Sequence, residues 1–255
     1  MNVRVHMNTD RPRALALRWW VALGALLATV FAAQAGPLEE SGSTAFRMKP
    51  TAEAAAALVG KKLRANTLER AVWTQDRELT DALLRAGADP NAPSSGIRHP
   101  LIVVAAMQGD PQIIVNLISH GAKVNAASET GSPLFWAARQ WNLEAVRTLL
   151  AGGADVKYTG SDGGTVLHTT VGDGNDVRIA ELLLDKGADL EARKNGMTSL
   201  MEAAMFGRVD WVRLFLQRQA RVNARTPSGQ TPLALSRTFG RDPVMERLLT
   251  DAGAH

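Results

Sequence analysis

The 255-residue chain contains no cysteine, which excludes disulfide frameworks, thiolate zinc sites, iron–sulfur clusters and any cysteine nucleophile. It also lacks an excess of one charge once its N-terminus is set aside. Four arginines and one acid fall within residues 1–35, and the remaining sequence carries 25 positive and 24 negative charges. A nearly neutral domain offers no positive field for phosphates, so we expect no nucleic-acid partner.

The first 35 residues have the three-part layout of a secretory signal peptide. An arginine-rich stretch over residues 1–18 precedes an uncharged apolar run from Trp19 to Ala33. Small residues, Ala33 and Ala35, then stand at positions −3 and −1 of a predicted cleavage site after Ala35. The apolar run is shorter than the ~20 residues of a membrane-spanning helix. The alternative is an uncleaved inner-membrane anchor, which a tilted helix or a thinned bilayer would accept.

Cleavage would release the mature chain into the periplasm or the medium, and without cleavage the signal segment would be its only membrane contact. Residues 36–50 contain Gly-Pro, Ser-Gly-Ser-Thr and Lys-Pro, which predict a flexible leader. Residues 51–63 are predicted to form a short N-terminal capping helix, because Thr51 can cap it and Gly60 can stop it.

A period of 32 to 34 residues dominates the rest of the sequence. Gly-Ala pairs recur with the glycine at positions 87, 121, 153, 187 and 253, and Gln219-Ala220 fills the missing place. Nineteen or twenty residues before each pair stands an aliphatic residue that opens a short apolar run: Leu68, Ile102, Leu134, Leu167, Leu200 and Leu233. Two landmarks in one register indicate a tandem repeat architecture.

Motifs at this period resemble the signature of ankyrin repeats. Thr231-Pro232-Leu233, Ser132-Pro133-Leu134 and Thr165-Val166-Leu167-His168 are similar to its T-P-L-H opening. Ala137-Ala138 and Ala203-Ala204 match its small pair, and Gly87-Ala88-Asp89-Pro90-Asn91-Ala92 matches its closing segment. The resemblance covers about residues 64–255 and implies an all-α repeat solenoid, with each unit a helix-turn-helix followed by a hairpin-like finger. Six units are expected, at about 64–97, 98–130, 131–162, 163–195, 196–228 and 229–255.

Several residues of this signature have a physical role. Thr231 can cap a helix and Pro232 suits its first turn. Gly87, Gly121, Gly153 and Gly187 can end helices in the left-handed conformation. Gln219 stands where the pattern requires such a glycine, at an expected cost of roughly 1 kcal/mol. Trp141 replaces the glycine that ends the first helix of its unit, so we expect this unit to turn in another way.

No arrangement of residues predicts catalysis. His99, His120, His168 and His255 fall in different units, and the resemblance implies that the His168 ring hydrogen-bonds backbone across adjacent turns. Asp162-Gly163-Gly164 and Asp173-Gly174-Asn175-Asp176 lack the carboxylate spacing of calcium loops and are explained as turns. Asp89, Asp155 and Asp189 lie one per unit, too far apart for acid–base pairing. We therefore predict a chain that is not an enzyme, with no cofactor and no metal.

By similarity to ankyrin proteins, a protein partner would bind the concave face, formed by the fingers and the residues just after each small pair. Met and aromatic residues at such exposed places are typical of interface cores. The candidates are Met107, Trp136, Arg139, Tyr158, Met205, Phe206 and Phe239. The alternative is that the aromatic rings pack against neighbouring fingers. Charges on the fingers, at Glu129, Lys157, Arg193, Lys194 and Arg225, would adjust specificity or serve only as solvated loop charge.

These observations favour a non-enzymatic, monomeric binding protein in a bacterial periplasm. Resemblance to small exported bacterial ankyrin-repeat proteins suggests support of an oxidative-stress enzyme such as catalase, or an immunity protein that neutralises a delivered toxin. A secreted, host-directed effector is a second class. An enzyme is a third, and it would need a catalytic pair converging from neighbouring units.

Overall fold

The computed structural model describes residues 66–92, 99–172, 176–238 and 242–255. The chain divides into two units, Met1–Met48 and Lys49–His255, and all described residues belong to the second. The predicted signal peptide, leader and capping helix lie outside the described residues, and so does Phe239.

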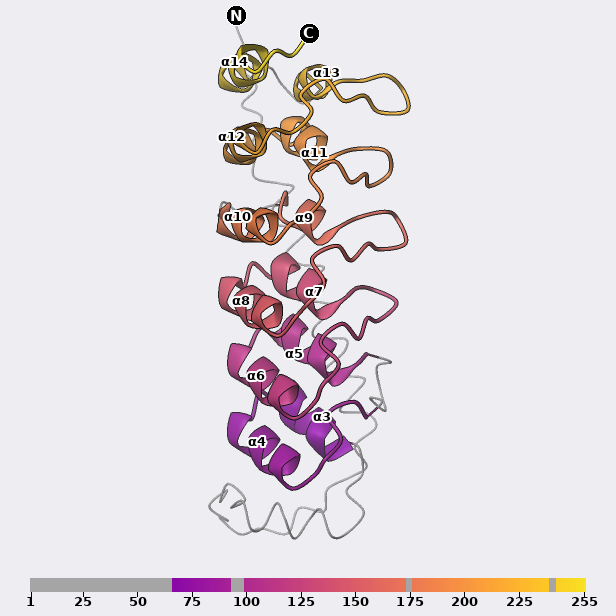
Figure 1. Ribbon diagram of the computed structural model, residues 1–255, viewed down its shortest axis with the longest axis vertical. Coiled ribbons are helices and arrows are strands. Elements are labelled where there is room, and N and C mark those ends of the chain that lie inside the picture. The colour runs from indigo at the N-terminus through magenta and orange to yellow at the C-terminus, as the bar shows by residue number, and fades with distance from the viewer. Residues whose placement is uncertain (1–65, 93–98, 173–175, 239–241) are drawn as a thin grey trace, which may run out of the picture. The chain divides into compact units, whose positions relative to one another are not determined.

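The described residues form six consecutive helix pairs, numbered here one to six from the N-terminal side (Figure 1). The first helix of each pair is called the inner helix and the second the outer helix. In chain order the pairs are α3 (Asn66–Trp73) with α4 (Arg77–Arg85), α5 (Leu101–Gln108) with α6 (Pro111–Ser119), α7 (Pro133–Arg139) with α8 (Leu143–Ala151), α9 (Val166–Thr169) with α10 (Arg178–Asp185), α11 (Ser199–Met205) with α12 (Val209–Gln217), and α13 (Pro232–Ser236) with α14 (Pro243–Asp251).

The pairs stack in chain order. Inner helices contact the next inner helix, as α5 contacts α3 and α7, and outer helices contact the next outer helix, as α6 contacts α4 and α8. Loops between one pair and the next project beside the inner helices as fingers (Figure 1). Isolated β-bridges close three of these fingers, at Ser128 with Gly131, Thr159 with Thr165, and Lys194 with Met197. Over the described ranges, no helix is long and apolar enough to cross a membrane.

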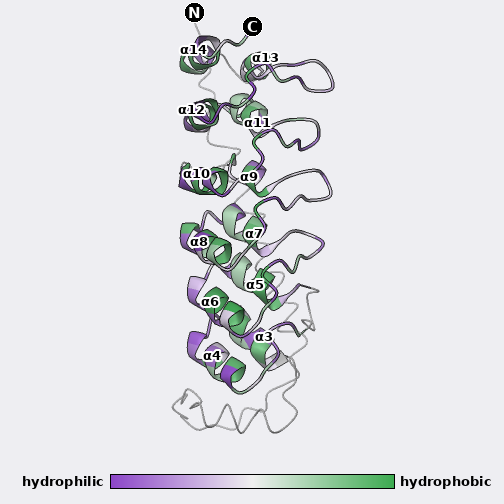
Figure 2. Cartoon of the chain, viewed as in Figure 1, coloured by the Kyte–Doolittle hydropathy of each residue, from purple (hydrophilic) through white to green (hydrophobic). Residues whose placement is uncertain are grey.

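Small and branched apolar residues fill the space between layers. Ala137, Ala138 and Ala203 are fully buried on the inner helices, which lets neighbouring inner helices approach closely. Each outer helix of pairs one to four buries a leucine completely: Leu83, Leu117, Leu149 and Leu183. Figure 2 shows the apolar character concentrated on the helices rather than on the fingers. Burying such a side chain contributes about 2 kcal/mol, and because the contact crosses pairs, each layer depends on its neighbours.

Hydroxyl side chains begin several of the inner helices. Thr231 Oγ1 accepts a hydrogen bond from the Ala234 N–H at 3.3 Å, and Ser132 Oγ accepts one from Phe135. Pro232 occupies the first turn of α13, where its missing N–H costs nothing. The T-P-L and S-P-L motifs therefore set where these helices start.

Each outer helix ends in the same backbone turn. Gly87, Gly121, Gly153 and Gly187 have φ between 88° and 90°. The alanine that follows donates back into the helix, as Ala88 N–H does to Leu83 O at 3.0 Å. Gln219 has φ 65° in the same place, and Ala220 N–H donates to Phe215 O at 2.9 Å. A non-glycine residue thus occupies a left-handed position in pair five.

The expectation that Trp141 changes the turn after α7 is wrong. Trp141 has φ 57°, and Asn142 N–H donates to Ala137 O at 3.2 Å, just as Arg208 N–H donates to Ala203 O after α11. The left-handed conformation is retained because the indole ring gains contacts elsewhere: its centroid lies 6.2 Å from that of Trp211.

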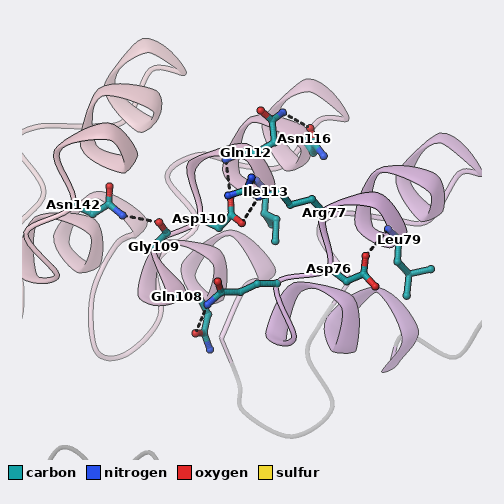
Figure 3. Close-up of polar contacts among 11 residues, drawn as sticks. Asp76, Arg77, Leu79, Gln108, Gly109, Asp110, Gln112, Ile113, Asn116 and Asn142 are labelled. Carbon is teal, nitrogen blue, oxygen red and sulfur yellow. Dashed lines mark hydrogen bonds and ion pairs between the residues drawn. The ribbon is translucent and has the colours of Figure 1, made fainter. Parts of the chain in front are cut away.

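Polar residues at the starts of the outer helices also join neighbouring pairs (Figure 3). The Asp110 carboxylate caps α6 by accepting the Gln112 N–H at 2.9 Å, and it receives Arg77 Nε from the preceding pair at 2.7 Å. This hydrogen bond raises the pKa of Arg77. Asn142 caps α8 and donates its side-chain N–H to Gly109 O at 2.6 Å. Asp110 and Asn142 therefore each cap a helix and also bond to the preceding helix pair.

Candidate functional site

The candidate site is the face formed by the inner helices and the fingers beside them (Figure 1), which corresponds to the face that the ankyrin resemblance predicts to be concave. Residues just after each small pair stand at the C-terminal ends of the inner helices. Met107 and Met205 hold this place in α5 and α11, and both are half-buried. Helices α7 and α9 lie between α5 and α11 in the stack, so the two methionines belong to separate parts of the face.

Among the apolar partner-binding candidates that the structure describes, Phe206 is the most exposed. It is the C-cap residue of α11, it is 54% exposed, and the left-handed Gly207 follows it. Of the large apolar residues that the structure describes, only Val115 and Val244 are comparably exposed, and they lie on outer helices α6 and α14. The equivalent positions in pairs two and three are Gln108 and Gln140. Repeat five therefore has an aromatic ring where repeats two and three have a polar side chain.

Trp136 and Tyr158 are half-buried and pack against the hydrophobic core. The Trp136 ring meets Phe135 edge to face, with centroids 6.0 Å apart. The guanidinium of the exposed Arg139 lies 5.8 Å from the Trp136 ring centroid, a cation–π geometry. These two rings contribute to packing, and Arg139 and the outer edges of the rings remain at the surface.

Lys194, a predicted finger charge, is engaged within the chain. Its Nζ lies 3.4 Å from Glu202 Oε1, and Glu202 is only 5% exposed on α11. Burial raises the pKa of Glu202, while the charge of Lys194 opposes this shift. Sequence reasoning missed Glu202, although a signal existed: an acid stands one residue before the small pair, where Trp136 and Leu235 are apolar.

Arginines on the fingers also bond within the chain. Arg193 Nη1 donates to Gly196 O at 2.8 Å and to Arg225 O of the next finger at 2.9 Å. Arg225 Nη1 donates to Gly229 O at 3.0 Å. Glu129 and Lys157 have exposed side chains. The fingers are therefore joined to one another by some of the charges that sequence reasoning assigned to specificity.

His168 links pair four to pair five. Its Nδ1 accepts the Thr165 N–H at 3.2 Å, and its Nε2 lies 3.3 Å from Met197 O. Because a carbonyl only accepts, the network assigns the proton to Nε2. Burial lowers the pKa of His168, so the ring is neutral at pH 7. Through these contacts the ring links the start of α9 to the finger that precedes α11.

The aspartates identified in the sequence stabilise turns by accepting backbone hydrogen bonds. Asp89, Asp155 and Asp189 each accept the backbone N–H two residues later, at 2.8 to 2.9 Å. Asp162 does the same for Gly164 at 2.8 Å. Residues 173–175 lie outside the described part. Among the residues that are described, no three His, Asp or Glu side chains gather as a metal site.

A row of asparagines at the base of the fingers was not foreseen as a structural device. Asn91 donates to Gly121 O at 2.9 Å and accepts the Lys123 N–H at 2.9 Å. Asn125 makes the same two bonds to Gly153 and Asp155, and Asn223 makes them to Gly253 and His255 after α14. The available signal was the recurring Asn of the closing motif. Lys157 takes this place between pairs three and four.

Stacked helix pairs with projecting fingers and a core shared between layers define a helical repeat solenoid, a class of interaction module. A family model described as "Ankyrin repeats (3 copies)" matches residues 68–160 and 152–226. The chain belongs to the ankyrin-repeat family.

Relatives share the repeats rather than their whole architecture. Human "SH3 and multiple ankyrin repeat domains protein 2" is 31% identical over 67% of this chain but only 9% of its own length. "Ankyrin repeat domain-containing protein SAT10" of Stachybotrys chartarum is 30% identical over 72% of this chain and 10% of its own. "Palmitoyltransferase AKR1" of Lachancea kluyveri is 30% identical over 57% of this chain and 20% of its own length.

A solved structure supports the same fold. The crystal structure of the human ASB11 ankyrin repeat domain superposes with a TM-score of 0.63 at 26% sequence identity. The match covers 74% of this chain and 84% of the other. Ankyrin repeats form a protein-interaction scaffold, and this chain is one by membership of the family.

Proposed function

We propose that the chain is a non-enzymatic scaffold of six repeats that binds a partner protein through its concave face as a monomer. One observation carries this proposal: Phe206 is 54% exposed on this face, at a position held by glutamine in two other repeats. An exposed aromatic ring leaves apolar surface in contact with water and adds little to the stability of the fold. Aromatic residues are enriched among the energetically dominant residues at the centres of protein interfaces.

The surroundings of Phe206 suit an anchor of this kind. Met205 is half-buried beside it, and a flexible thioether adapts to a partner surface. Lys194 and Glu202, the latter one helical turn before Phe206, pair with each other rather than with solvent ions. We assign Arg139 over Trp136, Tyr158 and Met107 to the periphery of the same contact; Phe239, outside the described residues, is proposed as a further partner-binding residue.

A matched pair of variants tests the anchor. Phe206→Gln introduces the residue found at the equivalent position of repeats two and three, and Val244→Gln changes a residue that is equally exposed, at 54%, on outer helix α14. We expect Phe206→Gln to weaken partner capture by about tenfold or more, as for a central aromatic contact, and Val244→Gln to leave it unchanged. Equal capture by both variants would remove Phe206 from the interface.

We propose a periplasmic location after cleavage following Ala35, on the basis of the arginine-rich, apolar and small-residue pattern of residues 1–35. N-terminal sequencing of the protein recovered from a periplasmic fraction tests this proposal. A mature chain that begins at Gly36 is expected, whereas a chain retained in the inner membrane with residue 1 intact would establish the anchored alternative.

For the partner, we propose an oxidative-stress enzyme such as catalase, on the resemblance to small exported bacterial ankyrin-repeat proteins. Capture from periplasmic extract with the chain and with Phe206→Gln, followed by mass spectrometry, distinguishes the candidates. A toxin bound in place of such an enzyme would establish an immunity protein. Recovery of the chain from the medium or from host cells would establish an effector instead.

A further inference from the structure

The finger between pairs four and five ends in a two-residue turn. Lys194 and Met197 exchange both backbone hydrogen bonds at 2.9 Å, which leaves Asn195 and Gly196 at the tip. Asn195 has φ 50° and Gly196 has φ 83°, the paired left-handed geometry typical of an Asn-Gly hairpin turn. The Asn195 side chain is exposed.

Asn195 differs from the asparagines at the bases of the fingers. The side chains of Asn91, Asn125 and Asn223 each donate one hydrogen bond and accept another, so both amide atoms are held. Within the described part of the chain, the Asn195 side chain and the Gly196 N–H make no hydrogen bond, although the Asn195 N–H donates to Asp162 O at 3.2 Å.

The residue that follows each asparagine also distinguishes Asn195 from the other three. Asn91, Asn125 and Asn223 are each followed by alanine, whereas Asn195 is followed by glycine. A glycine nitrogen has no neighbouring side chain to block its approach to the preceding carboxamide. Asn195 alone among these four residues therefore combines an exposed, unbonded carboxamide with a following glycine whose N–H is also unbonded, although Gly196 itself is half-buried against the Pro227 ring.

We propose that Asn195-Gly196 is a site of spontaneous deamidation. The Gly196 nitrogen loses its proton to solvent base and attacks Cγ of Asn195, forming a C–N bond and closing a five-membered succinimide ring. The Cγ–Nδ2 bond breaks, and the nitrogen leaves as ammonia after gaining a proton. Water then opens the ring at either carbonyl to give aspartate or isoaspartate. The net change is addition of one water and loss of one ammonia, with no oxidant or reductant.

The product would alter the concave face. A carboxylate at position 195 would stand next to Lys194, which already faces the Glu202 carboxylate, and beside Asp162, whose backbone contacts Asn195. Isoaspartate would also lengthen the backbone of the turn by one atom. This change would disturb the Lys194–Met197 pairing and the bond from Arg193 to Gly196 O. Deamidation would thus add a negative charge at position 195 and weaken the hydrogen bonds of the turn, whatever partner the face binds.

Peptide mapping by mass spectrometry tests the proposal. The purified full chain is incubated at mildly alkaline pH, folded in buffer and unfolded in urea, and conversion is followed at Asn195, Asn125 and Asn223. Comparing each asparagine with itself in the unfolded chain cancels the effect of the following residue. Circular dichroism verifies that the buffered sample remains folded.

We expect Asn195 to convert at a similar rate in the folded and unfolded chains. Asn125 and Asn223 should convert at least about tenfold more slowly when folded, because two hydrogen bonds must open before either can react. Asn195→Gln should abolish the product at this peptide. If folding protects Asn195 as strongly as Asn125 and Asn223, the turn holds the reacting atoms apart and the proposal is overturned.

Discussion

The indole ring of Trp141 meets that of Trp211 edge to face, with centroids 6.2 Å apart and planes at 87°. Trp141 follows α7 in repeat three, and Trp211 lies on α12 in repeat five. The Trp141 ring also borders repeat four, since a Cβ placed at Gly172 would lie 3.5 Å from its Cζ2. Two aromatic residues therefore join layers that are not adjacent in the stack.

This contact predicts that Trp141→Gly lowers stability, although glycine would relieve the left-handed strain. Relief is worth about 1 kcal/mol, whereas the aromatic pair and the buried part of the indole contribute together about 2–3 kcal/mol. A net loss of about 1–2 kcal/mol is expected in urea unfolding. A more stable variant would mean that the ring pair adds little to the fold.

Gln219→Gly is expected to have the opposite effect. Gln219 has the same left-handed conformation, with φ 65°, but its side chain is exposed. Glycine should therefore raise the free energy of unfolding by about 1 kcal/mol. Thermal melts of this variant and Trp141→Gly form a matched comparison, because the backbone change is the same and only the side-chain contacts differ. A lower melting temperature for Gln219→Gly would contradict the strain argument.

Lys157→Asn should extend the row of asparagines at the finger bases to the boundary between pairs three and four. An asparagine here could donate to Gly187 O and accept the Asp189 N–H, as Asn125 does with Gly153 and Asp155. Two new exposed hydrogen bonds should add about 1 kcal/mol. The measurement is the urea midpoint of Lys157→Asn beside that of Asn125→Ala. Asn125→Ala should lower the midpoint, and a lower midpoint for Lys157→Asn as well would disprove the proposed equivalence.

Acid should weaken the stack through His168. Burial is the main cause that lowers its pKa from 6.5, and the Lys194 charge adds to it, while the Met197 carbonyl, Asp162 and Asp189 oppose it. The unfolded chain therefore binds the proton more strongly than the folded chain. The stabilising contribution is present above about pH 6.5 and is lost as the pH falls from there through the lower, folded pKa.

A His168→Met variant checks this pH dependence. Met201 holds the equivalent place in repeat five, where its sulfur accepts the Thr198 N–H at 3.4 Å. The melting temperature of the unaltered chain should fall more between about pH 7 and about pH 5 than that of the variant. Parallel pH profiles would show that His99 or the carboxylates, rather than His168, control acid stability.

Much of the fold follows from local sequence. Thr231 and Pro232 specify a helix start, and Gly87 specifies a helix end, because these features depend on a few neighbouring backbone groups. The regular spacing then predicts the stacked helix pairs. Trp141 was misjudged because its conformation is stabilised by Trp211, seventy positions further along the chain, and no local pattern contains that contact.

The candidate site divides in the same way. Sequence periodicity alone determined which residues end the inner helices, Phe206 among them, since the repeat fixes their register. Only the tertiary structure decided that Phe206 is exposed while Trp136 and Tyr158 pack on the core, that Lys194 pairs with Glu202, and that Asn195 is unbonded while Asn125 is held. Burial and hydrogen bonding are properties of neighbouring layers, and a repeat acquires them only when it stacks.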